Sequence, residues 1–199
     1  HQMVADLAKI PRKQAKVINL ALMYGMGQTR LAESLDVTVE EAKGLIQQYH
    51  QQVPFVKELM DSVQRHVGGP MGSGFVRSLL GRKCRFNLWE PNLFVTSKAL
   101  PKEQATIEYG NNIKRAYTYK SLNRLIQASA ADQAKKAMCE IYKTGKVPLI
   151  QIHDELAFSV KDLEEAKALQ EIMETCVELQ VPSPTDAALG PNWGNLKEA

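Results

Sequence analysis

The stretch GGPMGSG, residues 68–74, separates two parts of the sequence that differ in their periodicity. Successive Gly and Pro residues end a helix and favour a turn or a linker. Helical spacing precedes this stretch, whereas FVRSLLGRKCRF, residues 75–86, predicts a strand, a turn at Gly81-Arg82 and a second strand. We therefore predict an α+β fold with a domain boundary at 70/71.

The first predicted domain, residues 1–70, is helical. Thr38 with Glu41 three residues later has the pattern of a capping box, which predicts a helix start. Gly residues after Tyr24 end an earlier helix that has no internal Pro or Gly. The predicted helices of this domain cover residues 12–24, 29–35, 38–52 and roughly 55–67.

The second predicted domain, residues 71–199, mixes small strands with long helices. Apolar and β-branched runs flank the acidic residues of VPLIQIHDELAFSV, residues 147–160, and predict two strands that meet at a tight turn. The other predicted segments are an irregular stretch over 87–102, a long helical region over 101–144 with a break at Gly110, and an amphipathic helix over 161–179.

The composition is that of a globular protein. Of the 199 residues, 44% are hydrophobic and 24% are charged, which argues against a fibre or a disordered tail. No apolar run reaches the roughly 20 residues that span a bilayer, and no signal peptide is visible. We expect a cytoplasmic protein without membrane contact, in the host cytoplasm if it is of phage origin. Because the first residue is His, we also expect a fragment of a longer chain.

The predicted helix over residues 12–24 has two faces. Ala15, Ile18 and Leu22 form an apolar side, while Arg12 and Lys16 lie together on a different side. Two cations one helical turn apart suit successive phosphates of one ligand. The alternative is a solvated charged face, because this spacing is common on helices.

Two adjacent acids, Asp154 and Glu155, follow His153 in the predicted turn. Like charges at such a turn must be solvated or neutralised by a cation, and paired carboxylates suit Mg²⁺. A plain exposed hairpin turn is the alternative. A metal-dependent phosphohydrolase is a weaker possibility, because no HExxH motif or second His cluster accompanies these residues.

Several ordered motifs together resemble the family A (DNA polymerase I-like) DNA polymerases, in particular the bacteriophage branch. Arg12-x3-Lys16-x7-Tyr24-Gly25 resembles motif B of the fingers, and IHDE at 152–155 resembles motif C of the palm. Asn123 and Gln127 in LNRLIQASAAD match a palm helix. FVRSLLGRK at 75–83 and GPNWG near the end also fit. The resemblance implies a fingers subdomain over 1–70 and the C-terminal part of a palm over 71–199.

The resemblance further implies template-dependent addition of deoxynucleotides to a primer 3′ end by a two-metal mechanism with Mg²⁺. Arg12, Lys16 and His1 would bind the triphosphate of the incoming deoxynucleoside triphosphate. Lys16 would also act as an acid towards the leaving pyrophosphate. Tyr24 would stand where the templating base enters, and Gly25 would let the helix end move.

The motif C and palm-helix residues would contact the metal ions and the primer-template DNA. Asp154 would be a ligand of the two Mg²⁺ ions, and Glu155 would support the same site less directly. His153 would hold the primer terminus. Asn123 and Gln127 would check acceptor atoms in the minor groove of the duplex.

Two departures from the family pattern have consequences. Leu20 stands where the family carries an aromatic residue that contacts the incoming nucleotide, so sugar discrimination is in doubt. Motif A, a DYSxxE-like strand with the other metal-binding aspartate, is not found in these residues. We therefore expect the chain to be inactive alone and to need an N-terminal polymerase portion that carries motif A. A non-catalytic module that binds nucleic acid or nucleotides is the alternative.

Overall fold

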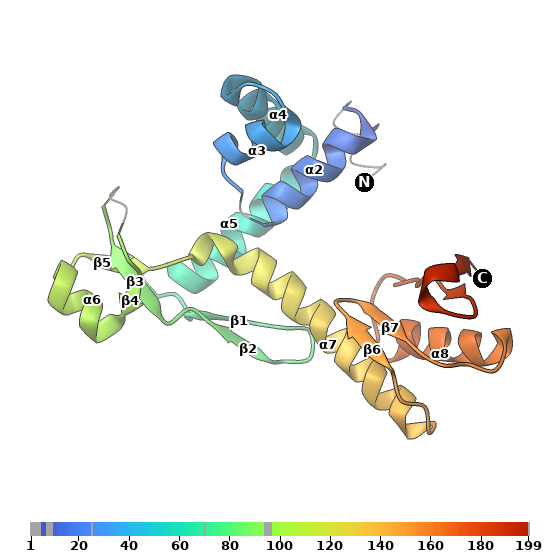
Figure 1. Ribbon diagram of the computed structural model, residues 1–199. Helices are drawn as coiled ribbons and strands as arrows, with labels where there is room; N and C mark the ends of the chain where they lie inside the picture. The colour runs from blue at the N-terminus through green and yellow to red at the C-terminus, as the bar shows by residue number, and fades with distance from the viewer. Residues whose placement is uncertain (1–4, 7–9, 25, 70, 94–96, 199) are drawn as a thin grey trace. The chain divides into compact units, whose positions relative to one another are not determined.

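The computed structural model describes residues 5–6, 10–24, 26–69, 71–93 and 97–198. The chain divides into two compact units, His1–Ile126 and Gln127–Ala199. The predicted boundary at 70/71 lies inside the first unit, and the division into fingers and palm stays a prediction. Helices and small antiparallel sheets make up the described part, so the predicted α+β class is confirmed (Figure 1).

The first unit begins with a helical core. Its helices pack around buried side chains that include Ile18, Leu31 and Tyr49. The last of these helices begins at Pro54. Proline is tolerated at a first helical position, because a backbone N–H there would have no hydrogen-bond partner within the helix. The helices are α2 (Arg12–Met23), α3 (Gln28–Leu35), α4 (Val39–Gln52) and α5 (Pro54–Gly68), in agreement with the sequence-based prediction.

A capping box starts α4, as predicted. The Glu41 N–H donates to Thr38 Oγ1 at 3.2 Å, and the Thr38 N–H donates to the Glu41 carboxylate at 2.8 Å. The hydrogen bond from the Thr38 backbone, followed by that from its hydroxyl, lowers the pKa of Glu41 below 4.5. The carboxylate therefore contributes stability above about pH 4.5 that is lost as the pH falls through the lowered pKa.

Replacement of the capping residue, Thr38→Ala, is expected to destabilise the protein by about 1 kcal/mol, because the Glu41 N–H loses its acceptor. Urea unfolding followed by circular dichroism at neutral pH measures the change. Thr29→Ala, inside α3, is the matched control, and an equal loss in both variants would contradict the assignment of the cap.

Among the described residues of the first unit, the strands form two small sheets. A hairpin pairs β1 (Phe75–Arg77) with β2 (Lys83–Arg85), as the sequence predicts. The second sheet has the order β4-β3-β5 and is antiparallel. Its elements are β3 (Leu88–Pro91), β4 (Leu100–Pro101), the helix α6 (Lys102–Tyr109) and β5 (Ile113–Arg115), followed by the 3-10 turn η1 (Thr118–Lys120).

This second sheet corrects two predictions. The segment 87–102 is not simply irregular, because it contains β3 and β4. The helical region predicted over 101–144 is interrupted well beyond Gly110, because β5 pairs with β3 through Trp89↔Arg115 and its neighbours. The long helix α7 starts only at Ser121 (Ser121–Lys143).

Gly74 joins α5 to β1 in a conformation that favours glycine, with φ +74°. A Cβ added here would lie 2.6 Å from Cζ of Arg115. The Arg115 guanidinium is held against this backbone, because its Nη1 also donates to the Phe86 carbonyl at 3.0 Å.

Gly74→Ala is expected to destabilise the protein by about 2 kcal/mol, because the left-handed backbone is strained and Arg115 must move. The urea midpoint should fall while the slope stays unchanged. Gly81→Ala isolates the backbone cost, since Gly81 has φ +89° but no heavy atom within 4 Å of the added Cβ. Equal effects in the two variants would show that the contact with Arg115 contributes nothing.

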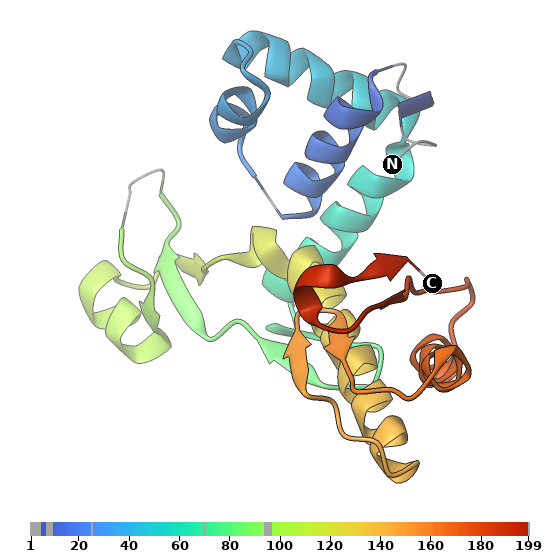
Figure 2. The ribbon, with the colours of Figure 1, turned by 45° about the vertical axis from the view of Figure 1, so that its right-hand side comes forward.

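The second unit contains the rest of α7 and two hairpins. Its first hairpin pairs β6 (Ile150–Ile152) with β7 (Glu155–Ala157), as predicted, and Figure 2 shows these strands as antiparallel arrows. Asp162 caps the helix that follows, α8 (Leu163–Thr175), by accepting from the Glu165 N–H at 2.9 Å. The C-terminal elements are β8 (Ala188–Leu189), η2 (Trp193–Asn195) and β9 (Lys197–Glu198).

Candidate nucleic-acid interface

Helix α2 has the two faces that its sequence predicts. Ala15 and Ile18 are fully buried in the helical core of the first unit. Arg12 and Lys16 are exposed on a different side of the same helix. Both cations are thus available to one solvent-side ligand, and the spacing of one turn suits neighbouring phosphate groups.

The orientation of α2 is fixed by a hydrogen bond to α4. The hydroxyl of Tyr49, which is fully buried, donates to Oδ1 of Asn19 at 2.7 Å. Burial raises the pKa of Tyr49 above its ordinary value of 10.0, so this hydroxyl keeps its proton. Because Asn19 is held from the core side, rotation of α2 about its axis would break this bond.

Tyr24 follows α2 as its C-terminal capping residue. Its N–H donates to the Leu20 carbonyl at 2.9 Å, and its side chain is 47% exposed. Leu20 is itself 38% exposed, so the residue that departs from the family pattern lies at the surface. His1 and Gly25, for which roles are also predicted, lie outside the described residues.

The IHDE segment forms the predicted tight turn. Ile152 pairs with Glu155 across the hairpin, so His153 and Asp154 are the two turn residues. His153 has φ +53°, a left-handed conformation that suits such two-residue turns. The side-chain amide of Gln151 donates to the His153 carbonyl at 2.6 Å and braces the turn. Asp154 and Glu155 are both exposed.

The carboxylate oxygens of Asp154 and Glu155 could supply some of the ligands of a magnesium ion. Carboxylate oxygens are the protein ligands that Mg²⁺ prefers, and it usually takes only one or two of them. Among the described residues, no group of three or more His, Cys, Asp or Glu side chains could hold a metal ion. Asp154 and Glu155 therefore fit the ion as a pair of ligands that needs oxygens from elsewhere.

Asn123 and Gln127 lie four residues apart on α7, one turn of the helix. Asn123 is half-buried and Gln127 is exposed. Between them, Arg124 is oriented by the β1–β2 hairpin region: its Nη1 donates to the Arg85 carbonyl at 2.8 Å, and its guanidinium lies 4.5 Å from the Phe86 ring centroid. A fixed cation thus stands beside the predicted minor-groove residue.

The predicted site residues fall into local groups. Arg12, Lys16 and Tyr24 belong to the first unit, and the turn with Asp154 belongs to the second. The roles predicted for these residues stay predictions.

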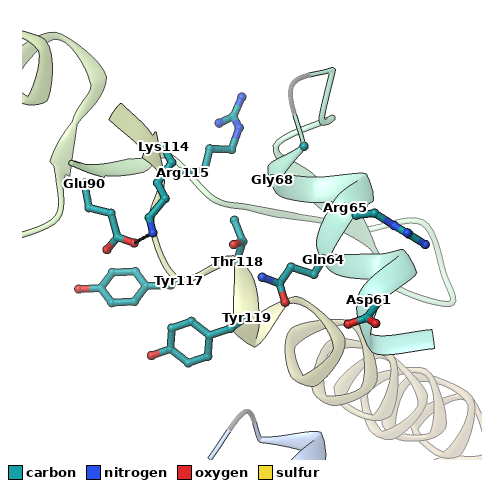
Figure 3. A pocket seen from close by; sticks show the side chains of 11 residues that line it. Asp61, Gln64, Arg65, Gly68, Glu90, Lys114, Arg115, Tyr117, Thr118 and Tyr119 are labelled. Atoms are coloured by element: carbon teal, nitrogen blue, oxygen red, sulfur yellow. Dashed lines mark ion pairs between the residues drawn. The ribbon is translucent and has the colours of Figure 1, made fainter. Parts of the chain in front are cut away.

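The sequence-based prediction missed a cavity in the first unit. It has a volume of about 510 Å³, and Figure 3 shows the side chains that line it from α5, β3, β5 and η1. The signal that could have found it is KRAYTYK, residues 114–120, where cations flank two tyrosines. The lining residues are Asp61, Gln64, Arg65, Gly68, Gly69, Glu90, Lys114, Arg115, Tyr117, Thr118 and Tyr119.

No described helix combines the length and the apolar character needed to cross a membrane.

Comparison with known proteins gives a consistent result across nearly the whole chain. The family model described as DNA polymerase family A matches residues 2–195. A DNA-directed DNA polymerase of Pseudomonas phage M6 is 33% identical over 229 residues, which cover 98% of this chain and 31% of the phage protein. DNA polymerase I of Geobacillus stearothermophilus is 30% identical, with coverage of 99% of this chain and 21% of that protein.

A solved structure shares the fold. The POL domain of Pol1 from M. smegmatis, in complex with DNA primer-template and dNTP, aligns with a TM-score of 0.67 at 27% identity. The alignment covers 92% of this chain and 32% of that one. The chain therefore spans about a third or less of the length of these proteins.

Proposed function

Since the chain belongs to DNA polymerase family A, we propose that it supplies the nucleotide-binding helix and one metal-binding turn of a template-dependent DNA polymerase. The observation that carries the proposal is the family match over residues 2–195, within which α2 presents Arg12 and Lys16 to solvent. The solved relative with primer-template and dNTP supports DNA and deoxynucleoside triphosphates as the ligands.

In this proposal, the exposed face of α2 binds the triphosphate. Arg12 contributes a planar guanidinium that can donate two hydrogen bonds to one phosphate, and Lys16 contributes a compact charge one turn away. Lys16 Nζ donates its proton to the oxygen of the leaving pyrophosphate. Tyr24 and Leu20 lie next along the exposed side of the helix and border the nucleotide and the templating base.

The turn of the β6–β7 hairpin binds Mg²⁺ and the 3′ end of the primer in this proposal. Asp154, supported by Glu155, would hold Mg²⁺, which when bound stabilises charge on the phosphate oxygens during transfer. His153 donates a hydrogen bond to the backbone of the primer terminus. Asn123 and Gln127 on α7 contact minor-groove acceptors that are common to all correct base pairs.

The proposed enzyme needs a second metal-binding aspartate, which these residues do not supply. The sequence lacks a DYSxxE-like motif A with a second metal-binding aspartate. Asp154 and Glu155 alone would leave the Mg²⁺ site short of a carboxylate that the chemistry needs. We therefore propose that a polymerase portion with motif A is the partner of this chain and that the 199 residues alone do not polymerise.

Primer extension tests the proposal. The 199-residue protein should incorporate no nucleotide, whereas one polypeptide that joins it to an upstream portion with motif A should extend a primer according to the template. Template-dependent incorporation by the 199 residues alone would overturn the proposed inactivity. No extension by the joined polypeptide would overturn the proposed activity.

A further inference from the structure

Arg124 is the first charged residue of α7 and directly follows Asn123, one of the two residues proposed to contact the minor groove. The proposed mechanism gives Arg124 no task. Its side chain is exposed, yet it has two partners at the end of the β1–β2 hairpin. A side chain with two fixed partners can act as an anchor as well as a charge.

Arg124 joins the start of α7 to the end of β2. Its Nη1 donates to the Arg85 carbonyl at 2.8 Å, and its guanidinium carbon lies 4.5 Å from the centroid of the Phe86 ring. A hydrogen bond from a charged donor is stronger than a neutral one, and a cation over an aromatic ring adds a second attraction. The hydrogen bond spans 39 positions of the sequence, so it connects two elements that are distant along the chain.

The segment that follows β2 is fixed independently of α7. The Phe86 N–H donates to the Gly74 carbonyl at 2.8 Å, and the Phe86 carbonyl accepts from Arg115 Nη1 at 3.0 Å. The Phe86 side chain is 3% exposed and belongs to a core cluster with Val67 and Val76. A contact with this segment therefore holds the helix, because the segment has its own supports.

Apolar packing holds the same turn of α7 from the core side. Leu125 packs against the cluster that contains Phe86, and Ser121 and Leu122 at the start of the helix are buried. Apolar packing is not directional, whereas a hydrogen bond is. The bond from Arg124 therefore adds what the packing lacks, a restraint on rotation of the helix about its axis.

Asn123 takes its position from this turn of the helix. It is half-buried, and its amide is only one methylene group away from the backbone, so the backbone sets where the amide lies. A side-chain tip lies about 5–6 Å from the helix axis, and a rotation by about 10° would move it by about 1 Å. A shift of that size is enough to lose a hydrogen bond to a base edge.

We propose that Arg124 is a positioning residue, which anchors the first turn of α7 to the end of β2 and thereby aims the Asn123 amide at the minor groove. Without this anchor, the enzyme senses the shape of the newly formed base pair less strictly. The inference rests on the proposed function, because it requires that Asn123 contact the duplex.

Primer extension with a minor-groove analogue tests the inference in a polypeptide that joins this chain to a portion with motif A. 3-Deazaguanine lacks the N3 acceptor of guanine and is placed in turn at the last base pairs of the duplex, in either strand. At the position that Asn123 contacts, the analogue should lower kcat/KM of the wild type by about 10-fold. Asn123→Ala should abolish this penalty and so identifies the position.

Arg124→Ala should lower kcat/KM with guanine by about 10-fold and reduce the penalty for the analogue to about 2-fold or less, because a displaced amide no longer senses the acceptor. Adding Arg124→Ala to Asn123→Ala should cause little further loss, since two residues that act through one contact are not additive. Arg124→Lys, which keeps the charge but not the planar guanidinium, should restore the penalty only in part. A penalty of wild-type size in Arg124→Ala would overturn the inference.

The alternative role for Arg124 is a direct contact with a phosphate of the DNA, since a guanidinium has more donors than the one used here. The dependence of primer-template affinity on salt distinguishes the two roles. The slope of log affinity against log salt should be the same in Arg124→Ala as in the wild type. A slope smaller by about 0.9 would show a phosphate contact and overturn positioning.

Lys135→Ala is the matched control, because it removes an exposed cation from the same helix. It should leave the penalty for the analogue unchanged, and a reduced penalty in this variant would contradict the specific role of Arg124. Hydrogen exchange in the 199-residue protein tests the anchor without any extension. Amides in the first two turns of α7 should exchange about 10-fold faster in Arg124→Ala, and unchanged exchange would overturn the anchor.

These measurements separate a failure of the inference from a failure of the proposed function. No extension by the wild type, or an Asn123→Ala variant that alters no penalty, would overturn the proposed role of Asn123 and the inference with it. An Asn123-dependent penalty that persists in Arg124→Ala would overturn the inference alone.

Discussion

Asp154→Asn in a polypeptide that also carries motif A is expected to slow primer extension by about 10³-fold, the scale for losing a group that stabilises developing charge. The amide keeps the shape of the side chain and loses its charge, so its affinity for Mg²⁺ falls. Asn also suits a turn as well as Asp does, and the exposed position tolerates the change in the fold. Single-turnover extension with saturating DNA measures the chemical step.

Two comparisons make this result specific. Glu178→Gln removes one exposed carboxylate from the same unit and should leave extension unchanged. Glu155→Gln should have a smaller effect than Asp154→Asn, in keeping with its indirect role. Full extension by Asp154→Asn would contradict the metal-binding role and favour a non-catalytic binding module. Phosphate release without a template would instead indicate a phosphohydrolase.

Lys16→Ala in the same polypeptide should lower kcat/KM for the incoming deoxynucleotide by about 10²-fold, because the triphosphate loses a charge-assisted contact and the leaving pyrophosphate loses its acid. Affinity for primer-template DNA should not change, since Lys16 is assigned to the nucleotide. Steady-state kinetics with one correct nucleotide, together with DNA binding measured separately, distinguish the two effects.

Lys43→Ala is the matched control for the change of charge. Lys43 is exposed on α4 in the same unit, and its ammonium lies 3.8 Å from Glu40 at the surface. It should retain the kinetics of the wild type. Equal losses of DNA affinity in Lys16→Ala and Lys43→Ala would show a general effect of positive charge and contradict a triphosphate site on α2.

The parts predicted well from the sequence are those fixed by local interactions. Thr38 and Glu41 satisfy each other within one helical turn, so a short sequence pattern is enough to place the start of α4. The turn at His153 and Asp154 lies between two apolar runs that are adjacent in the sequence and pair with each other. The family resemblance, which rests on such local motifs, is confirmed by the match over residues 2–195.

The parts predicted poorly depend on pairing between distant residues. Ile113–Arg115 has the charges of a helix surface, yet it forms β5 because β3 offers a partner more than twenty residues earlier along the chain. Strands of two to four residues are also too short for an alternating pattern to emerge. The cavity of about 510 Å³ in the first unit was missed for the same reason, since residues of α5 and β3, which line it, lie far along the chain from Lys114 to Tyr119.

The hydrogen bond from Tyr49 to Asn19 couples α2 mechanically to α4. Tyr49 is fully buried, and its hydroxyl has its acceptor on the helix that carries Arg12 and Lys16. A swing of α2 that kept this bond would have to carry α4 with it. The helix that we propose binds the triphosphate would then move together with the helix that supports it.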